Sequence, residues 1–238
     1  MRIRVLQHVP HEGPAAIAEW AHARGHEMAI THVDIDGMTL PDESYDMLVI
    51  LGGPMGVADD EAYPWLTAEK RFVAQAVERA REGSSAVVGV CLGAQLIAHV
   101  SGASVTRNPE PEIGWYPVRR TPEAAEAVAL AGVPEELTVL HWHGDMFGIP
   151  RGAIRCLSSE ACPNQAFELA DGRIVGLQFH LEQTSASLPE MVAGNADELT
   201  MCGAYIQNRR QLLRADAPHV ECASTLYTVL DAIGRSVR

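Results

Sequence analysis

Several features that would place a chain in a specialised class are missing from this sequence. No apolar stretch approaches the roughly 18 residues of a transmembrane helix, and the first residues lack the apolar core of a secretion signal. Lys and Arg form no cluster, and the formal net charge of −13 argues against a nucleic-acid-binding surface. We therefore expect a cytoplasmic protein that binds neither membranes nor nucleic acids.

The cysteines also lack the spacing of the common cysteine frameworks. There are 5 of them, an odd number, and no C-x-x-C pair occurs, which argues against a disulfide scaffold and a zinc ribbon and favours a reducing compartment. The chain has no P-loop, no Gly-, Ser- or Pro-rich linker and no internal repeat. Its 238 residues, 47% hydrophobic and 21% charged, suit one large globular domain or two small ones.

Apolar runs alternate with helical periodicities up to Val100. The continuous run at 47–51 is typical of a strand buried on both faces, and the alternation predicts a mostly parallel sheet covered by helices. After Gly102 shorter strand-like runs follow, and Asp171-Gly172 predicts a hairpin, so this part should be mixed or antiparallel. The expected strands cover 3–9, 28–33, 47–51, 86–90, 112–119, 137–142, 154–158, 164–169 and 173–179; the expected helices cover 15–24, 64–81 and 94–100, and a loop covers 40–43.

The last fifty or so residues have helical character and carry no chemical motif. Ser187-Leu188-Pro189-Glu190 has the spacing of a capping box, and helices are expected near 189–207 and 220–233. The predicted organisation is a domain over 1–186 and a helical C-terminal extension over 187–238 that packs on the same domain.

The most informative stretch is Gly89-Val90-Cys91-Leu92-Gly93-Ala94-Gln95. A strand-like run ends at Cys91, a helix-like run follows at once, and glycines stand two residues before and after the cysteine. This is the layout of a nucleophile elbow, whose strained turn exposes the nucleophile above the sheet and places it at a helix N-terminus that favours the thiolate. The alternative is a buried structural cysteine in an ordinary strand-to-helix turn.

Two distant stretches could supply what a cysteine nucleophile needs. His180 and Glu182 follow a predicted strand, so the imidazole could hold the thiol proton while the carboxylate fixes its tautomer. Gly52-Gly53-Pro54 follows another strand, and backbone N–H groups can approach an oxyanion closely where glycines stand. Taken alone, a histidine or a Gly-Gly-Pro turn is common.

Gly-Val-Cys-Leu-Gly-Ala-Gln, Gly-Gly-Pro and Phe-His-Leu-Glu, in this order, resemble the class I glutamine amidotransferases of the triad type, in particular the glutaminase domain of GMP synthetase. The resemblance runs from about Asp46 to Glu182 and implies a three-layer, flavodoxin-like α/β sandwich without a cofactor. It implies a triad of Cys91, His180 and Glu182, with an oxyanion hole from the N–H groups of Gly53 and Leu92. Many members have proline where Leu181 stands, but the triad geometry depends on the histidine and the glutamate.

The resemblance also suggests where the substrate binds. Gln95 matches a family residue near the substrate, and His141 to Asp145 match a Ser-His-Gly-Asp-like loop whose backbone meets the amino-acid end of glutamine. The implied substrate-binding residues are Gln95, His143, Gly144 and Asp145. The segment Glu112 to Trp115 resembles one that lies beside the site in the GMP synthetase domain.

His141-x-His143-x-Asp145 also permits a metal site. Metallo-hydrolases of the β-lactamase type continue this pattern with a further histidine, but Met146 stands there, and the sequence shows no other cluster to complete a shell. We therefore expect no metal. His99 and the cysteines other than Cys91 are expected to be structural or inert.

Three functions remain open from the sequence. The first is hydrolysis of the glutamine side-chain amide through a Cys91 thioester, with ammonia released free or delivered to an acceptor on a synthetase partner protein. The second is a stand-alone γ-glutamyl hydrolase or peptidase acting on γ-glutamyl conjugates. The third is a non-catalytic interaction protein, which the presence of all three triad residues disfavours.

Overall fold

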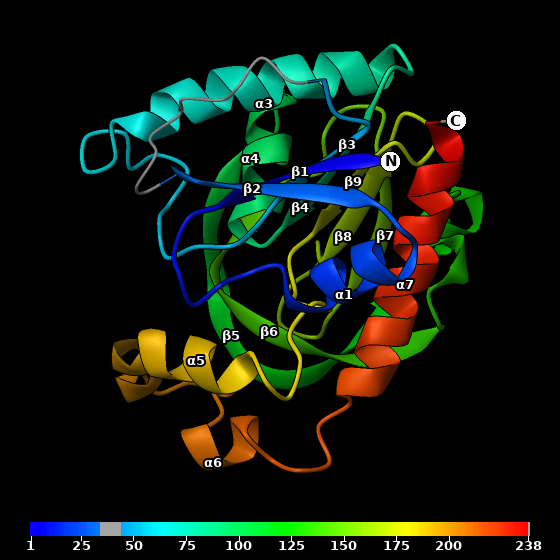
Figure 1. Ribbon diagram of the computed structural model, residues 1–238. Coiled ribbons are helices and arrows are strands. Elements are labelled where there is room, and N and C mark those ends of the chain that lie inside the picture. Colours follow the sequence, from blue (N-terminus) through cyan, green and yellow to red (C-terminus); the bar gives the residue numbers. More distant parts are fainter. Residues whose placement is uncertain (34–43, 238) are drawn as a thin grey trace.

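The strands of this computed structural model, which describes residues 1–33 and 44–237, form a single sheet (Figure 1). Within those ranges the sheet has nine strands in the order β2-β1-β3-β4-β9-β8-β7-β5-β6. The loop predicted at 40–43 lies outside the described residues. The strands are β1 Arg2–Gln7, β2 Glu27–His32, β3 Met47–Ile50, β4 Ala86–Val90, β5 Val105–Arg120, β6 Glu136–Phe147, β7 Ile154–Ser158, β8 Ala166–Leu169 and β9 Ile174–Leu177.

The β2-β1-β3-β4-β9 half of the sheet is parallel. All of β3 is buried, and its alternating side chains enter two separate cores: Val49 faces one, while Leu48 and Ile50 face the other. This is the expected consequence of a strand covered on both faces, because successive side chains point to opposite sides of a sheet.

Helices cover both faces of this parallel half. α1 (Ala15–Ala23) and α7 (His219–Ser236) contribute to the core that contains Val49, whereas α3 (Trp65–Arg81) and α4 (Leu92–Val100) contribute to the other. In Figure 1, α3 and α4 lie on one side of the sheet and α1 and α7 on the other. The predicted three-layer α/β sandwich with a mostly parallel central sheet is confirmed.

The remaining strands pair antiparallel, as the sequence indicates. β8 and β9 form the predicted hairpin, and Asp171 and Gly172 in its turn adopt the positive φ values that such turns require. β5 and β6 are longer than expected and form an extended ladder that includes the pair Glu112 and His143. The segment His141 to Asp145 therefore lies within a strand and not in a loop, because its backbone pairs with β5.

The C-terminal region is less helical than predicted. α5 (Leu188–Gly194) and the 3₁₀ turn η3 (Ala196–Thr200) end well before Gln207. The reason is tertiary: the Ile113 N–H donates to the Tyr205 carbonyl at 2.9 Å, and the Gln207 N–H donates to the Ile113 carbonyl at 2.7 Å. These bonds to β5 replace the hydrogen bonds of a helix.

The capping box predicted at Ser187 is also wrong. The Ser187 hydroxyl accepts from the Thr184 N–H at 2.9 Å and donates to Gln183 at 2.8 Å, so it does not cap α5. A capping box occurs instead at Asn208 and Gln211, at the start of α6 (Arg209–Leu212). The second predicted helix is confirmed as α7.

α7 closes one face of the molecule. Its buried residues include Leu226, Leu230 and Ile233, and the Trp20 indole N–H of α1 donates to Asp231 at 2.9 Å. Two 3₁₀ turns, η1 (Pro122–Glu126) and η2 (Leu130–Gly132), lie between β5 and β6. No helix in the described ranges combines the length and hydrophobicity needed to cross a membrane.

Candidate active site

The candidate site forms where parallel strands end. Cys91 follows β4 directly, Gly52 and Gly53 follow β3, and His180 follows β9, whose neighbour in the sheet is β4. The carboxyl ends of parallel strands share one edge of the sheet, so residues distant in sequence meet there. The fold thereby brings together the three stretches that the sequence singled out.

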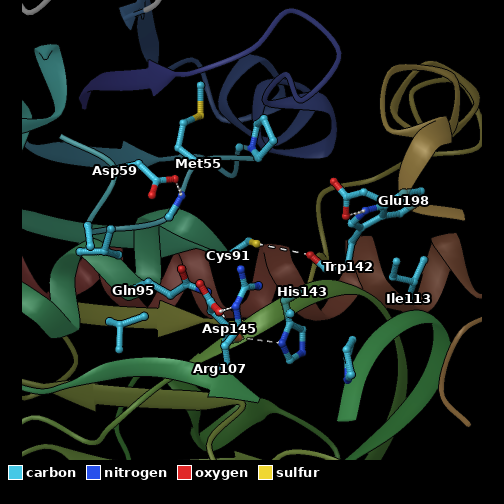
Figure 2. A pocket seen from close by; sticks show the side chains of 18 of the residues that line it. Met55, Asp59, Cys91, Gln95, Arg107, Ile113, Trp142, His143, Asp145 and Glu198 are labelled. Carbon is cyan, nitrogen blue, oxygen red and sulfur yellow. Dashed lines mark hydrogen bonds and ion pairs between the residues drawn. The ribbon is translucent and has the colours of Figure 1, made fainter. Parts of the chain in front are cut away.

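Cys91 occupies the predicted strained elbow. Its φ of 52° and ψ of −109° are unusual for a residue with a side chain, and α4 begins at the next residue. Glycines are required on both sides: a Cβ on Gly89 would lie 2.4 Å from the Gly93 carbonyl carbon, and one on Gly93 would lie 2.1 Å from the Ile50 carbonyl oxygen. The thiol donates to the Trp142 carbonyl at 3.6 Å (Figure 2).

His180 and Glu182 form a buried pair beside the cysteine. The His180 Nδ1 lies 2.6 Å from a Glu182 carboxylate oxygen, and the two residues are only 1% and 3% exposed. Burial acts to lower the pKa of His180, but the Glu182 carboxylate and the Cys91 sulfur outweigh it and hold that pKa well above 6.5. His180 Nε2 is buried and has no hydrogen-bond partner among the residues that the structure describes.

For Cys91, in contrast to His180, burial has a larger effect on the pKa than the neighbouring groups. It raises the pKa of the thiol, although His180 and the Leu92 N–H both favour the thiolate. The helix N-terminus alone therefore does not make Cys91 a thiolate, contrary to the emphasis of the sequence argument.

The glycine loop after β3 lies directly against the cysteine and the histidine. A Cβ on Gly52 would lie 3.4 Å from the Cys91 Cβ, 3.3 Å from the His180 Cε1 and 2.4 Å from a Glu12 carboxylate oxygen, so a larger residue would require the Glu12 carboxylate to move. A Cβ on Gly53 would lie 3.4 Å from Leu92. Gly53 and Leu92, the two predicted oxyanion-hole residues, are therefore neighbours beside Cys91.

A cavity of about 560 Å³ opens at this point. Cys91, Gly53 and the four predicted substrate-binding residues Gln95, His143, Gly144 and Asp145 all line it (Figure 2). The Gln95 amide donates to the Asp145 carbonyl at 3.4 Å, which joins the elbow helix to β6. His180 and Glu182 are buried and do not line the cavity.

Comparison with known proteins identifies the family of this chain. A family model described as glutamine amidotransferase class-I matches residues 15–196. The chain belongs to this family.

Two of the relatives match the chain over most of its length, and a third matches a part of a longer protein. The glutamine amidotransferase-like protein YfeJ of Salmonella typhimurium is 34% identical over 204 residues, 84% of this chain and 83% of the relative. The crystal structure of a glutamine amidotransferase from Thermotoga maritima superposes with a TM-score of 0.86 at 30% identity, covering 100% of this chain and 98% of that one. A glutamine-hydrolyzing GMP synthase of Latilactobacillus sakei is 29% identical over 66% of this chain, which corresponds to only 28% of the synthase.

Two further residues lie at the site, and the sequence patterns did not predict them. Glu12, which follows β1, is 6% exposed and lines the cavity, and its pKa is raised by burial against the opposing charge of His180. His8 is fully buried between the Gly52 carbonyl at 2.9 Å and a Glu69 carboxylate oxygen at 2.8 Å. Both residues follow β1, whose carboxyl end reaches the same edge of the sheet. Their position after a parallel strand was the only feature of the sequence that could have predicted them at the site.

The C-terminal region reaches the cavity as well. Glu198 of η3 and Met201 line it, and Glu198 accepts a hydrogen bond from the Trp142 indole at 3.1 Å. No sequence motif after residue 187 predicts these contacts, because they depend on tertiary packing against β6.

The remaining cysteines differ from Cys91. Burial raises the pKa values of Cys156, Cys162 and Cys222 to about 12, so their thiols stay protonated. Cys202 is exposed and does not line the cavity.

Proposed function

We propose that this chain hydrolyses the side-chain amide of glutamine through a γ-glutamyl thioester on Cys91. The observation that carries the proposal is the convergence of a strained cysteine, a buried histidine–carboxylate pair and a glycine loop at the edge of one cavity. Membership in the glutamine amidotransferase family supports the same chemistry.

In this proposal each residue has a defined role. His180 takes the Cys91 proton, the thiolate attacks the amide carbonyl carbon, and the N–H groups of Leu92 and Gly53 stabilise the resulting oxyanion. His180 then gives the proton to the departing ammonia, and the C–N bond breaks. Water, deprotonated by His180, cleaves the thioester, releasing glutamate and restoring the thiol. Glu182 holds the imidazole in one tautomer throughout, through its contact with Nδ1.

The amino-acid end of glutamine would bind near β6. Arg107 and Asp145 form an ion pair at 3.3 Å, and both line the cavity with Gln95, His143 and Gly144. Glutamine carries one carboxylate and one ammonium group on its α-carbon, and the pair offers a matching charge to each.

The released ammonia has two possible fates, free release or delivery to an acceptor on a synthetase partner. The second is supported by the similarity to a glutamine-hydrolyzing GMP synthase, of which the matched region is 28%. In that arrangement the present chain would supply ammonia to a separate synthetase protein.

A γ-glutamyl hydrolase is a second candidate, and the size of the cavity supports it. A volume of about 560 Å³ lies within the range of sites that hold drug-sized ligands. Such a site could take a γ-glutamyl conjugate, with an amine or a peptide leaving in place of ammonia.

For the organisation of the chain we propose an amidotransferase domain over 1–186 and an extension over 187–238 that packs on it. The burial of Cys222, Leu226 and Leu230 in the same core as α1 supports this proposal. The match to the family extends slightly further, to residue 196.

The test is to incubate the purified chain with glutamine and with γ-glutamyl dipeptides, measuring ammonia and free amine separately. We expect ammonia and glutamate from glutamine, and no turnover by Cys91→Ala. Cys202→Ala is the matched control, because Cys202 is exposed and does not line the cavity, and it should keep full activity. A glutamine-like electrophile should label Cys91 alone.

Turnover of dipeptides without turnover of glutamine would replace the first candidate by the second. Full activity of Cys91→Ala, or labelling spread evenly over the cysteines, would contradict both.

A further inference from the structure

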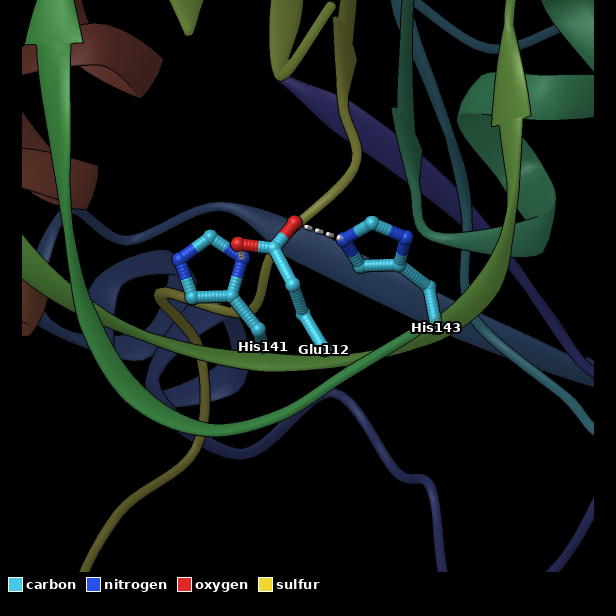
Figure 3. Close-up of side chains that lie close together, drawn as sticks. All are labelled: Glu112, His141 and His143. Atoms are coloured by element: carbon cyan, nitrogen blue, oxygen red, sulfur yellow. Dashed lines mark ion pairs between the residues drawn. The ribbon is translucent and has the colours of Figure 1, made fainter. Parts of the chain in front are cut away.

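Three buried side chains meet between β5 and β6, beside the candidate active site. Ligand atoms of Glu112, His141 and His143 all lie within 4.8 Å of one another, and none of the three residues is more than 6% exposed. Figure 3 shows the Glu112 carboxylate between the two imidazole rings. The closest contacts are 3.1 Å from His143 Nε2 to one carboxylate oxygen and 3.7 Å from His141 Nδ1 to the other.

Backbone carbonyls fix the tautomers of both histidines. His143 Nδ1 lies 3.0 Å from the Asp145 carbonyl oxygen, and His141 Nε2 lies 3.3 Å from the Tyr116 carbonyl oxygen. A carbonyl oxygen can only accept a hydrogen bond, so each of these nitrogens carries the proton. In the neutral imidazoles the lone pairs of His143 Nε2 and His141 Nδ1 are then the ones turned toward Glu112.

Those lone pairs face the Glu112 carboxylate, which accepts hydrogen bonds and offers them no proton. His141 Nδ1 is buried and has no hydrogen-bond partner among the described residues.

We propose that Glu112, His141 and His143 bind a divalent transition-metal ion, with Zn²⁺ the preferred occupant. Two imidazole nitrogens and one carboxylate are a donor set that suits zinc. One cation at their centre would satisfy both lone pairs and the carboxylate together.

The surroundings of the cluster match those of known metal sites. Ligating histidines usually donate their second N–H to a carbonyl or carboxylate, and ligating carboxylates are themselves hydrogen-bonded. Here Ser159 donates to one Glu112 oxygen at 2.8 Å, and the Gln165 amide donates to the other at 2.6 Å. The Gln165 amide oxygen is also buried and has no hydrogen-bond partner within the described part of the chain.

The ion would have a structural role at the active site. It would join β5 to β6 on either side of Trp142, whose carbonyl accepts the Cys91 thiol hydrogen bond. Side chains alternate along a strand, so the Trp142 side chain lies on the opposite face of β6 from those of His141 and His143.

The experiment uses the full chain after removal of metal with a chelator. Titration with Co²⁺ should give one ion per chain with visible d–d absorption and no thiolate charge-transfer band, and Zn²⁺ should displace it. Glu112→Gln and His143→Gln should weaken binding by about 100-fold or abolish it, and Ser159→Ala should weaken it by roughly tenfold. His22→Gln, on the exposed face of α1, should bind as the wild type does.

Three results would overturn the proposal: no stoichiometric binding by the wild type, a thiolate band in the cobalt spectrum, or undiminished binding by Glu112→Gln. Circular dichroism verifies that each variant is folded. If a ligand variant does not fold, Ser159→Ala decides the matter, because unchanged affinity there would place the ion elsewhere.

Discussion

At the scale of single residues, the site is an arrangement of buried charges around one imidazole. Glu182 contacts His180 directly, and Glu12 lies close enough for its own ionisation to respond to the charge of His180. His180 and Glu182 form a buried pair of opposite charges, and removal of one partner from such a pair costs free energy because the other charge is left unpaired. The ionisation of His180 therefore depends on its neighbours more than on its exposure.

Replacement of Glu182 by Gln tests this dependence. Without the carboxylate, burial of His180 is no longer opposed, and its pKa should fall from its raised value toward or below 6.5. The proposed glutaminase activity should fall by about 10²–10⁴-fold, since the imidazole loses both its tautomer control and its basicity. The imidazole NMR signal of His180 and kcat/KM measured across pH would show the two effects.

The same substitution should change stability with a definite sign. A histidine whose pKa is raised by folding stabilises the protein fully below its unfolded pKa, and this contribution is lost as pH rises through the folded value. The difference in unfolding free energy between wild type and Glu182→Gln should be largest near pH 6 and shrink at alkaline pH. Glu190→Gln, at an exposed position on α5, is the control; a pH-independent difference for Glu182→Gln would contradict the argument.

At the scale of elements, the elbow depends on how closely β4, α4 and β3 approach one another. Gly93 lies in the first turn of α4 against the backbone of Ile50, with no room for a side chain. Backbone atoms cannot move aside as a flexible side chain can, so the steric constraint is strict. The same approach brings the end of β3, and hence Gly53, to Leu92.

Gly93→Ala should therefore destabilise the protein strongly. The new Cβ would lie 2.1 Å from the Ile50 carbonyl oxygen, and we expect a loss of more than about 3 kcal/mol of unfolding free energy, or no folding at all. Gly13→Ala is the control, because the nearest atom to its Cβ would be 3.7 Å away, and its effect should stay within about 1 kcal/mol. Urea unfolding measures both losses. Equal losses would show that the backbone of Ile50 can move to admit a side chain at Gly93.

At the scale of the whole molecule, the C-terminal region completes the fold and the cavity. α7 covers one face of the sheet next to α1, and the segment around Ile206 adds a bridge to Ile113 of β5. Glu198 then reaches the cavity wall. A region without a recognisable motif is therefore part of the same packed body.

Two substitutions on α7 compare how much its buried face and its exposed face contribute to stability. Leu226→Ala should cost about 2–5 kcal/mol of unfolding free energy, because Leu226 is 1% exposed within the main core. Val220→Ala should change stability by less than about 0.5 kcal/mol, since Val220 is 79% exposed. Similar losses in the two variants, measured by denaturant unfolding, would show that α7 is not part of the core.

The sequence by itself determined the parallel half of the sheet, the elbow at Cys91 and the three stretches that meet there. These features are local or periodic: an apolar run of strand length, glycines at fixed spacing around a cysteine, a histidine after a strand. The rule that parallel strands present their carboxyl ends at one edge was enough to bring Cys91, His180 and Gly53 together.

Only the tertiary structure decided the rest, because it depends on pairings between distant segments. The backbone of 205–207 bonds to β5 instead of continuing a helix, and Glu112 meets His143 through the register of β5 and β6. Glu112, His141 and His143 come together only because β5 pairs with β6 in this register, which the spacing of the two histidines does not reveal. Hydrophobic period and motif spacing carry no information about such a register, which is set by the packing of the whole sheet.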